Sequence, residues 1–242
     1  MAHVAAEPGT VHVLHDRLPV IATWSPPGCR TTALARIMSG RGDVTVLDEP
    51  FNRRAADGSF SHRGRTYADD TALLDGVLEL AAVPGARTVY FADTTGLRHP
   101  ALLADPRFTA RIQHTFVIRD PAEVIAAHYP HNPYLTSEEV GFGHCWEIFE
   151  LARMASGTVP VVVDADDLAN RPTAVAAACA ARTGLPRHPA AGTSGGEPGP
   201  ARGFRPAAGT VHDNPYLAEL YEDQLPYYEW LRAHRLELEQ AA

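Results

Sequence analysis

The chain has 242 residues, of which 45% are hydrophobic, and a formal net charge of −8 at pH 7. A sequence of this length and apolar content can bury a substantial core, and we predict a single domain over residues 1–242. The negative charge argues against nucleic acid or an anionic membrane surface as the main partner. All 21 basic residues are arginines. The lack of lysine excludes a lysine-dependent phosphate loop and lysine-based covalent catalysis.

The cysteines and histidines point to no disulfide framework and no metal site. Cys29, Cys145 and Cys179 are far apart and odd in number, and no histidines show ligand spacing such as HExxH. Neither a secretory leader nor an apolar run long enough for a membrane helix is evident. We therefore expect a cytoplasmic protein that acts on a small molecule. The sequence leaves open whether the chain forms a homo-oligomer or a hetero-oligomer.

The first clear pattern is a strand, a turn and a helix. An apolar run over Pro19–Trp24 stops at Ser25–Gly28, whose two prolines and glycine cannot continue a strand, and helical spacing begins at Thr31. A turn that leads into a helix presents unpaired N–H groups, which favour phosphate or sulfate. An ordinary turn with a threonine cap is the alternative. The predicted anion-binding residues are Gly28, Cys29, Arg30, Thr31 and Thr32.

The rest of the chain alternates between strands and helices. We predict further strands at 44–47, 88–92, 114–118 and 159–163, and helices at 31–38, 69–82, 122–128, 136–155, 171–183 and 216–238. The strands are apolar on both faces, which predicts a doubly wound parallel sheet covered by helices, an α/β fold. Residues 52–67 are predicted to be a mobile surface loop. The Gly/Pro-rich segment 185–213 is predicted to be a lid or linker.

Polar residues follow the predicted strands at their carboxyl ends, where ligands bind in open α/β sheets. Asp48 and Glu49 follow the second strand, Asp93 the third and Arg119 the fourth. Helix capping is the alternative role for each of them. We predict that either Asp48 or Glu49 is the catalytic base and that Arg30 stabilises the anion.

A group of candidate substrate-binding residues lies around the predicted loop. Arginines in this loop would close over an anionic substrate, whereas a solvated surface is the alternative. The predicted substrate-binding residues are Phe51, Arg53, Arg54, His62 and Asp93.

Four segments carry a family resemblance. Ser25–Leu34 resembles the phosphosulfate loop of the sulfotransferases, and Phe116–Tyr129 is similar to their segment that binds the nucleotide 3′-phosphate. Leu47–Phe51 and Val163–Leu168 are similar to bacterial members. The resemblance implies a P-loop-like α/β fold and transfer of a sulfuryl group from 3′-phosphoadenosine 5′-phosphosulfate (PAPS) to a hydroxyl or amine. It places Arg119 at the nucleotide 3′-phosphate.

The resemblance also implies that PAPS is a co-substrate and that no cofactor is permanently bound. We add Arg202 and Arg205 to the predicted nucleotide-binding residues. Three positions differ from the family pattern. Gly28 replaces a basic residue, Ala127 replaces a serine, and the segment around Asp93 lacks the usual lysine and histidine.

These differences leave three functions open. The first is a sulfotransferase of secondary metabolism that acts on a small molecule. The second is a PAPS-independent cyclase, in which an internal nucleophile of the substrate displaces a sulfate or phosphate group. The third is a catalytically silent subunit of a heteromer.

Overall fold

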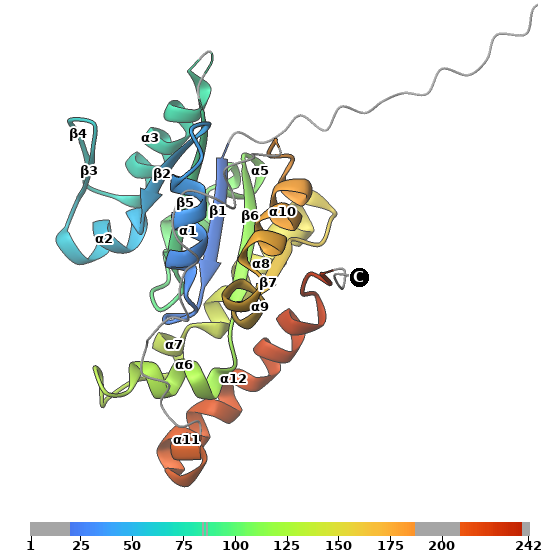
Figure 1. The fold of residues 1–242 in the computed structure, drawn as a ribbon. Coiled ribbons are helices and arrows are strands. Elements are labelled where there is room, and N and C mark those ends of the chain that lie inside the picture. The colour runs from blue at the N-terminus through green and yellow to red at the C-terminus, as the bar shows by residue number, and fades with distance from the viewer. Residues whose placement is uncertain (1–19, 84, 86, 187–208, 239–242) are drawn as a thin grey trace, which may run out of the picture.

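A computed structural model describes residues 20–83, 85, 87–186 and 209–238 of the chain. Its centre is a parallel five-stranded sheet with the strand order β2-β5-β1-β6-β7 (Figure 1). The strands are β1 (Val20–Ser25), β2 (Val44–Asp48), β5 (Thr88–Thr94), β6 (Ile112–Ile118) and β7 (Val161–Asp164). All five predicted strands form, and their ends differ from the prediction by no more than about two residues.

The central strand shows why these residues form this sheet. All six residues of β1 are buried, since β5 and β6 flank it and helices cover both faces. A strand buried on both faces must be almost wholly apolar, and the polar Thr23 is accommodated by hydrogen bonds to the Thr115 and Tyr90 hydroxyls. The predicted doubly wound α/β fold is confirmed.

The helices cover the two faces of the sheet unequally (Figure 1). One face carries α1 (Thr31–Ser39), α9 (Ala165–Asn170) and α10 (Pro172–Thr183). The other carries α3 (Asp70–Ala82), α4 (Pro100–Ala104), α5 (Pro106–Ala110) and α8 (Phe142–Ser156). At the carboxyl ends of the strands lie α6 (Pro121–His128), α7 (Ser137–Val140), α11 (Gly209–Asp213) and α12 (Pro215–Ala233). Helices therefore border the edge of the sheet at which the strands have their carboxyl ends.

The segment predicted as a loop at 52–67 is instead a helix and a hairpin. Helix α2 (Pro50–Asp57) is followed by β3 (Phe60–His62) and β4 (Arg65–Tyr67), which pair antiparallel. A two-residue turn joins the strands, and both of its residues have positive φ, 50° at Arg63 and 79° at Gly64. This is the backbone that tight hairpins require. The polar composition of the segment favoured the prediction of a loop over that of a hairpin.

The long helix predicted at 136–155 is broken in two. Gly141 separates α7 from α8 with a φ of 90°, a conformation that favours glycine. A Cβ at this position would lie 2.8 Å from the carbonyl oxygen of Thr95, so the loop after β5 packs against the break. Most of the predicted lid, with Arg202 and Arg205, lies outside the described residues. None of the described helices is long and apolar enough to cross a membrane.

A buried histidine is part of the core beneath the sheet. The Trp24 indole Nε1 donates to Nδ1 of His114 over 3.0 Å, and Nε2 of His114 donates to the carbonyl of Phe108 over 2.9 Å. Both ring nitrogens are therefore used by the neutral form, which has its proton on Nε2. Burial lowers the pKa of His114 to about 4.

Candidate active site

The predicted anion turn leads into helix α1, and no side-chain cap among the described residues satisfies the N–H groups at the start of this helix. Arg30 is the N-cap residue and holds a left-handed backbone with a φ of 61°. No side chain from the described part of the chain caps this helix. The N–H groups of Thr31 and Thr32 have no partner inside the helix, whereas that of Ala33 donates to the Arg30 carbonyl over 3.0 Å. The Arg30 guanidinium makes no ion pair with any described residue, so the turn carries an uncompensated positive charge.

A second polar group without a hydrogen-bond partner lies at the end of β1, just before this turn. Ser25 is fully buried, and its hydroxyl has no hydrogen-bond partner among the described residues. Because side chains alternate along a strand, Ser25 faces the same side as Thr23. On that side the Tyr90 hydroxyl bonds Thr23 and lies near Cys179 of α10. Because α10 packs beside α1, this is the face of the sheet that α1 covers. The buried hydroxyl therefore lies beneath the anion turn.

Cys29 lies inside the turn, and its role in anion binding stays a prediction. Its thiol is buried, and burial raises its pKa, which keeps the sulfur neutral. Its N–H donates to the carbonyl of Pro26 over 3.4 Å and is therefore not directed at a ligand. Cys29 supports the turn from inside.

Arg119 meets the anion turn, as expected from the topology. From β1 the chain continues to β2 at one edge of the sheet, and from β6 it continues to β7 at the other edge. The strand order therefore reverses between the neighbouring strands β1 and β6. Ligands bind at such a switch point. Nη1 of Arg119 donates to the Gly28 carbonyl over 3.3 Å, and Nη2 pairs with Glu123 at 2.5 Å. Its buried Nε lacks a partner within the described residues.

Ala127 of α6 lies next to this turn. A Cβ added to Gly28 would lie 3.9 Å from the Cβ of Ala127. The position where the family pattern has a serine therefore borders the anion turn, although this chain supplies no hydroxyl there.

The two candidate bases differ in their surroundings. Asp48 is 63% exposed and forms an ion pair with Arg53 of α2. Glu49 is half-buried, holds a left-handed backbone with a φ of 46° and is the N-cap residue of α2. Its N–H donates to the Ala92 carbonyl, which places Glu49 at the carboxyl edge of the sheet. Glu49 is therefore the better placed of the two carboxylates.

Asp93 and Phe51 are buried and position α2, and their contact with a substrate stays a prediction. The Asp93 carboxylate accepts the N–H groups of Phe51 and Asn52, both over 3.1 Å, at the start of α2. Burial raises the pKa of Asp93, although these two donors oppose the shift. Phe51 is fully buried against Phe91 and His99.

A buried polar network that sequence reasoning missed holds α2 against α3. His99 lies between Asp70, 3.2 Å from Nδ1, and the Asn52 side-chain oxygen, 3.1 Å from Nε2. Arg54 donates twice to the other Asp70 oxygen, over 2.9 and 2.6 Å. Burial opposes the charge on Asp70, but the bonds from His99 and Arg54 outweigh it and lower its pKa. Arg54, a predicted substrate residue, is therefore already paired.

We expect Asp70→Asn to destabilise the fold by about 1–3 kcal/mol at neutral pH, because it leaves His99 and Arg54 incompletely paired. Urea unfolding measures this free energy. Asp75→Asn on the same helix is the matched control, since the exposed Asp75–Arg107 pair should be worth less than about 1 kcal/mol. Equal losses in the two variants would show that the network adds nothing beyond surface pairing.

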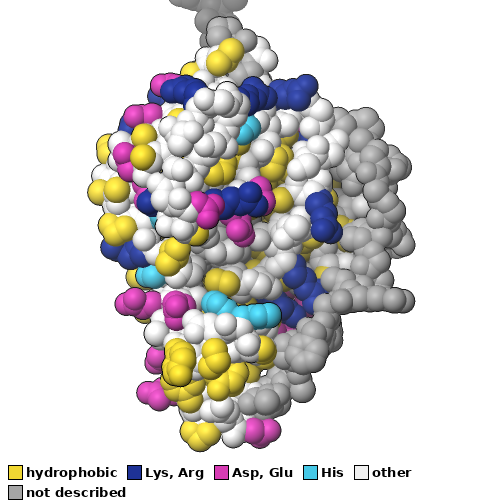
Figure 2. Space-filling view, turned by 90° about the vertical axis from the view of Figure 1, so that its left-hand side faces the viewer, with side chains coloured by type: hydrophobic (Ala, Val, Ile, Leu, Met, Phe, Trp, Pro, Cys, Tyr) yellow, Lys and Arg dark blue, Asp and Glu magenta, His cyan; other side chains and the backbone are white. Residues whose placement is uncertain are grey.

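The face that carries α2 and the hairpin has mixed charge. Figure 2 shows arginine and acidic side chains interleaved on it, and Arg53–Asp48 and Arg65–Glu79 are two of these pairs. His62 of β3 lies here too, and burial and the nearby Arg63 lower its pKa. Contact of Arg53 and His62 with a substrate stays a prediction.

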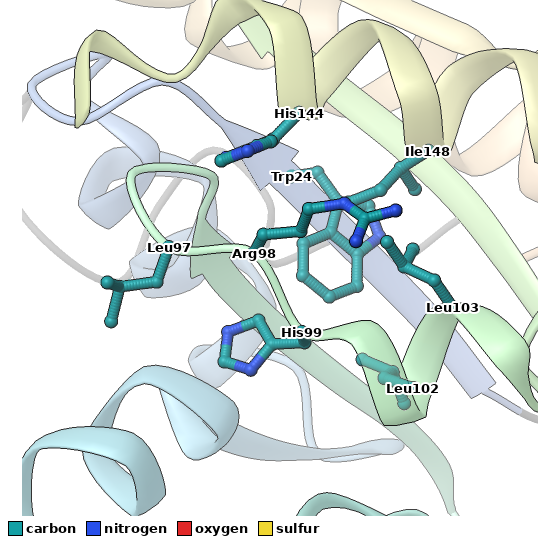
Figure 3. Close-up of a pocket in the computed structure, with 8 residues that line it drawn as sticks. All are labelled: Trp24, Leu97, Arg98, His99, Leu102, Leu103, His144 and Ile148. Carbon is teal, nitrogen blue, oxygen red and sulfur yellow. The ribbon is translucent and has the colours of Figure 1, made fainter. Parts of the chain in front are cut away.

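A small cavity lies on the face of the sheet that carries α4 and α8, and it is too small to be the active site. Figure 3 shows it beside Trp24, with Arg98, His99 and His144 around it. Its volume is about 10 Å³, which is the lower limit for a single water molecule.

Comparisons with known proteins bear on the family and the fold of the chain. The profile of a sulfotransferase domain family matches residues 19–207. A crystal structure of a sulfotransferase from Alicyclobacillus acidocaldarius aligns with 90% of this chain and 96% of its own, with a TM-score of 0.53 and 19% identity. The sulfotransferase domain of the Synechococcus PCC 7002 olefin synthase aligns with 91% of this chain and 96% of its own, at a TM-score of 0.46 and 14% identity.

A longer plant protein also matches. The branched-chain-amino-acid aminotransferase-like protein 2 of Arabidopsis thaliana is 29% identical over 165 residues, which are 65% of this chain and 28% of that protein. The chain thus spans less than a third of this relative. The profile match covers most of the chain, including the anion turn and Arg119. The chain belongs to the sulfotransferase domain family.

Proposed function

We propose that this protein transfers a sulfuryl group from PAPS to a hydroxyl or amine of a small molecule. The observation that carries the proposal is the uncapped start of α1, where Arg30 and Arg119 flank one set of open N–H donors. Two arginines and a helix N-terminus at a switch point suit a doubly anionic donor.

The reaction assigns a separate task to each group. The acceptor oxygen or nitrogen forms a bond to sulfur while the bond from sulfur to the phosphate oxygen breaks. Glu49 takes the proton that the acceptor loses. Arg30 and the N–H groups of Thr31 and Thr32 stabilise charge on the sulfuryl and departing phosphate oxygens, and one such donor is typically worth about 3–4 kcal/mol.

One observation favours a second candidate, the PAPS-independent ring closure. Arg119 is already paired with Glu123, and Ala127 offers no hydroxyl beside the turn. A 3′-phosphate would have to compete with the Glu123 carboxylate for the arginine. A substrate that already bears a sulfate or phosphate ester needs only the anion turn and a base, since its own nucleophile displaces the ester group.

Calorimetric titration with 3′-phosphoadenosine 5′-phosphate tests the nucleotide site. Arg119→Ala should weaken binding by about 1.5–3 kcal/mol, the value of a charge-assisted hydrogen bond. Glu123→Gln should instead tighten binding several-fold, because it removes the carboxylate that competes for Arg119.

The two variants act in opposite directions only if the nucleotide phosphate reaches Arg119. Binding that neither variant changes would place the nucleotide elsewhere. A wild-type protein that does not bind the nucleotide would favour the ring-closing reaction. Turnover of a pre-sulfated substrate without PAPS would then be the decisive result.

A further inference from the structure

A groove of about 350 Å³ opens on the surface between α7, α8 and α12. This volume is within the range of small-molecule sites. None of the residues assigned to sulfuryl transfer lines it. The lining residues are Ser137, Glu138, Gly143, His144, Trp146, Glu147, Gln224 and Tyr227.

A buried acceptor without a partner belongs to the groove wall. Gln224 is 1% exposed, and its Nε2 donates to the Ser137 carbonyl over 3.1 Å and to the Ser137 hydroxyl over 2.6 Å. A carbonyl can only accept, so these bonds fix the orientation of the amide. The Oε1 of Gln224 has no partner in the described structure and is itself buried, so Gln224 contributes a fixed wall to the groove rather than a contact for a ligand.

His144 adds an acceptor to the groove. Its Nδ1 lies 3.1 Å from the Thr95 carbonyl, which requires the proton on Nδ1. In the neutral ring Nε2 is then an acceptor. His144 lies between this groove and the small cavity of Figure 3, and it lines both.

The charge of the groove is negative. Arg98 neutralises Glu147 through two hydrogen bonds of 2.8 and 2.6 Å. Glu138 is exposed and forms no ion pair with any residue that the structure describes. The wall therefore carries one uncompensated carboxylate, which favours a cationic ligand.

Two exposed aromatic rings complete the groove. The rings of Trp146 and Tyr227 lie 5.7 Å apart at an interplanar angle of 49° and are 37% and 36% exposed. Tilted, solvent-facing rings beside a carboxylate attract the apolar body of a ligand and, through their faces, a cation.

We propose that this groove is a binding site for a small molecule with a primary ammonium on an apolar body. Such a group has N–H donors, and the groove offers two acceptors that suit them, the Glu138 carboxylate and His144 Nε2. The apolar body packs against Trp146 and Tyr227. None of the lining residues belongs to the anion turn, and the proposal does not depend on the proposed function.

Calorimetry on the full chain near neutral pH tests the site without any sulfuryl donor. Benzylamine is the probe, and benzyl alcohol is its neutral counterpart of similar shape. Benzylamine should bind about tenfold more tightly or better, since hydrogen bonds to charged groups exceed neutral ones. Trp146→Leu should weaken benzylamine about two- to fivefold. Glu138→Gln should also weaken it and reduce its salt dependence.

Trp230→Leu is the matched control, because Trp230 is an exposed tryptophan of α12 that does not line the groove. It should leave benzylamine binding unchanged. Equal binding of the two probes would overturn the proposal, as would no binding of either. A loss in Trp230→Leu as large as that in Trp146→Leu would do the same.

Discussion

Replacing Glu49 with glutamine is expected to lower kcat for sulfuryl transfer by about 10²–10⁴, the usual contribution of a positioned general base. The amide keeps the size of the side chain but cannot take a proton from the acceptor. Glu49 is expected to matter because it lies at the carboxyl edge of the sheet, where its N–H is bound to Ala92. The measurement is the steady-state rate with PAPS and an acceptor found by screening hydroxyl and amine compounds.

Asp48→Asn is the matched control for this variant. Asp48 is exposed and paired with Arg53, and such surface pairs contribute less than about 1 kcal/mol. We therefore expect only a small change in kcat. A large loss in Asp48→Asn with full activity in Glu49→Gln would reverse the assignment. Full activity in both variants would remove the carboxylate base from the mechanism.

The stability of the fold should fall by about 3 kcal/mol between pH 6.5 and pH 4 because of His114 alone. Its pKa is lowered from 6.5 to about 4 by burial, with the Phe108 carbonyl opposing the shift. Between these values the unfolded chain binds a proton that the folded chain does not. Stability is therefore complete above pH 6.5 and is lost as the pH falls toward 4.

Urea unfolding at a series of pH values measures this slope. His114→Phe should remove the His114 contribution to the slope while lowering stability at neutral pH, because Trp24 and the Phe108 carbonyl lose their partners. His131→Gln, at an exposed position, should leave the slope intact. An unchanged slope in His114→Phe would assign the acid sensitivity to other groups.

The sheet could be predicted from the sequence because its strands are buried on both faces. Such strands are continuous apolar runs, and each one ends at a sharp change to polar residues. The anion turn could be predicted for a similar reason, since Pro26, Pro27 and Gly28 interrupt the first run at one place. The resemblance placed Arg119 at the nucleotide 3′-phosphate. The structure brings Arg119 against Gly28, and its contact with a nucleotide stays a prediction.

The network around α2 could not be predicted, because its members lie far apart in the sequence. Asn52, Asp70 and His99 come together only when α2 and α3 pack beside β5. No local pattern marks them. The α2 segment itself had weak signals, Pro50 at its first turn and Gly58 at its end. Its polar exposed face resembled a loop.

The left-handed backbone at Arg30 and Glu49 places stability and activity in opposition. A residue with a Cβ costs roughly 1–2 kcal/mol in this conformation, whereas glycine adopts it freely. Glycine at position 30 or 49 should therefore raise the melting temperature while removing a charged group from the crevice. Variants of this protein selected only for heat resistance would tend to gain these glycines and lose turnover.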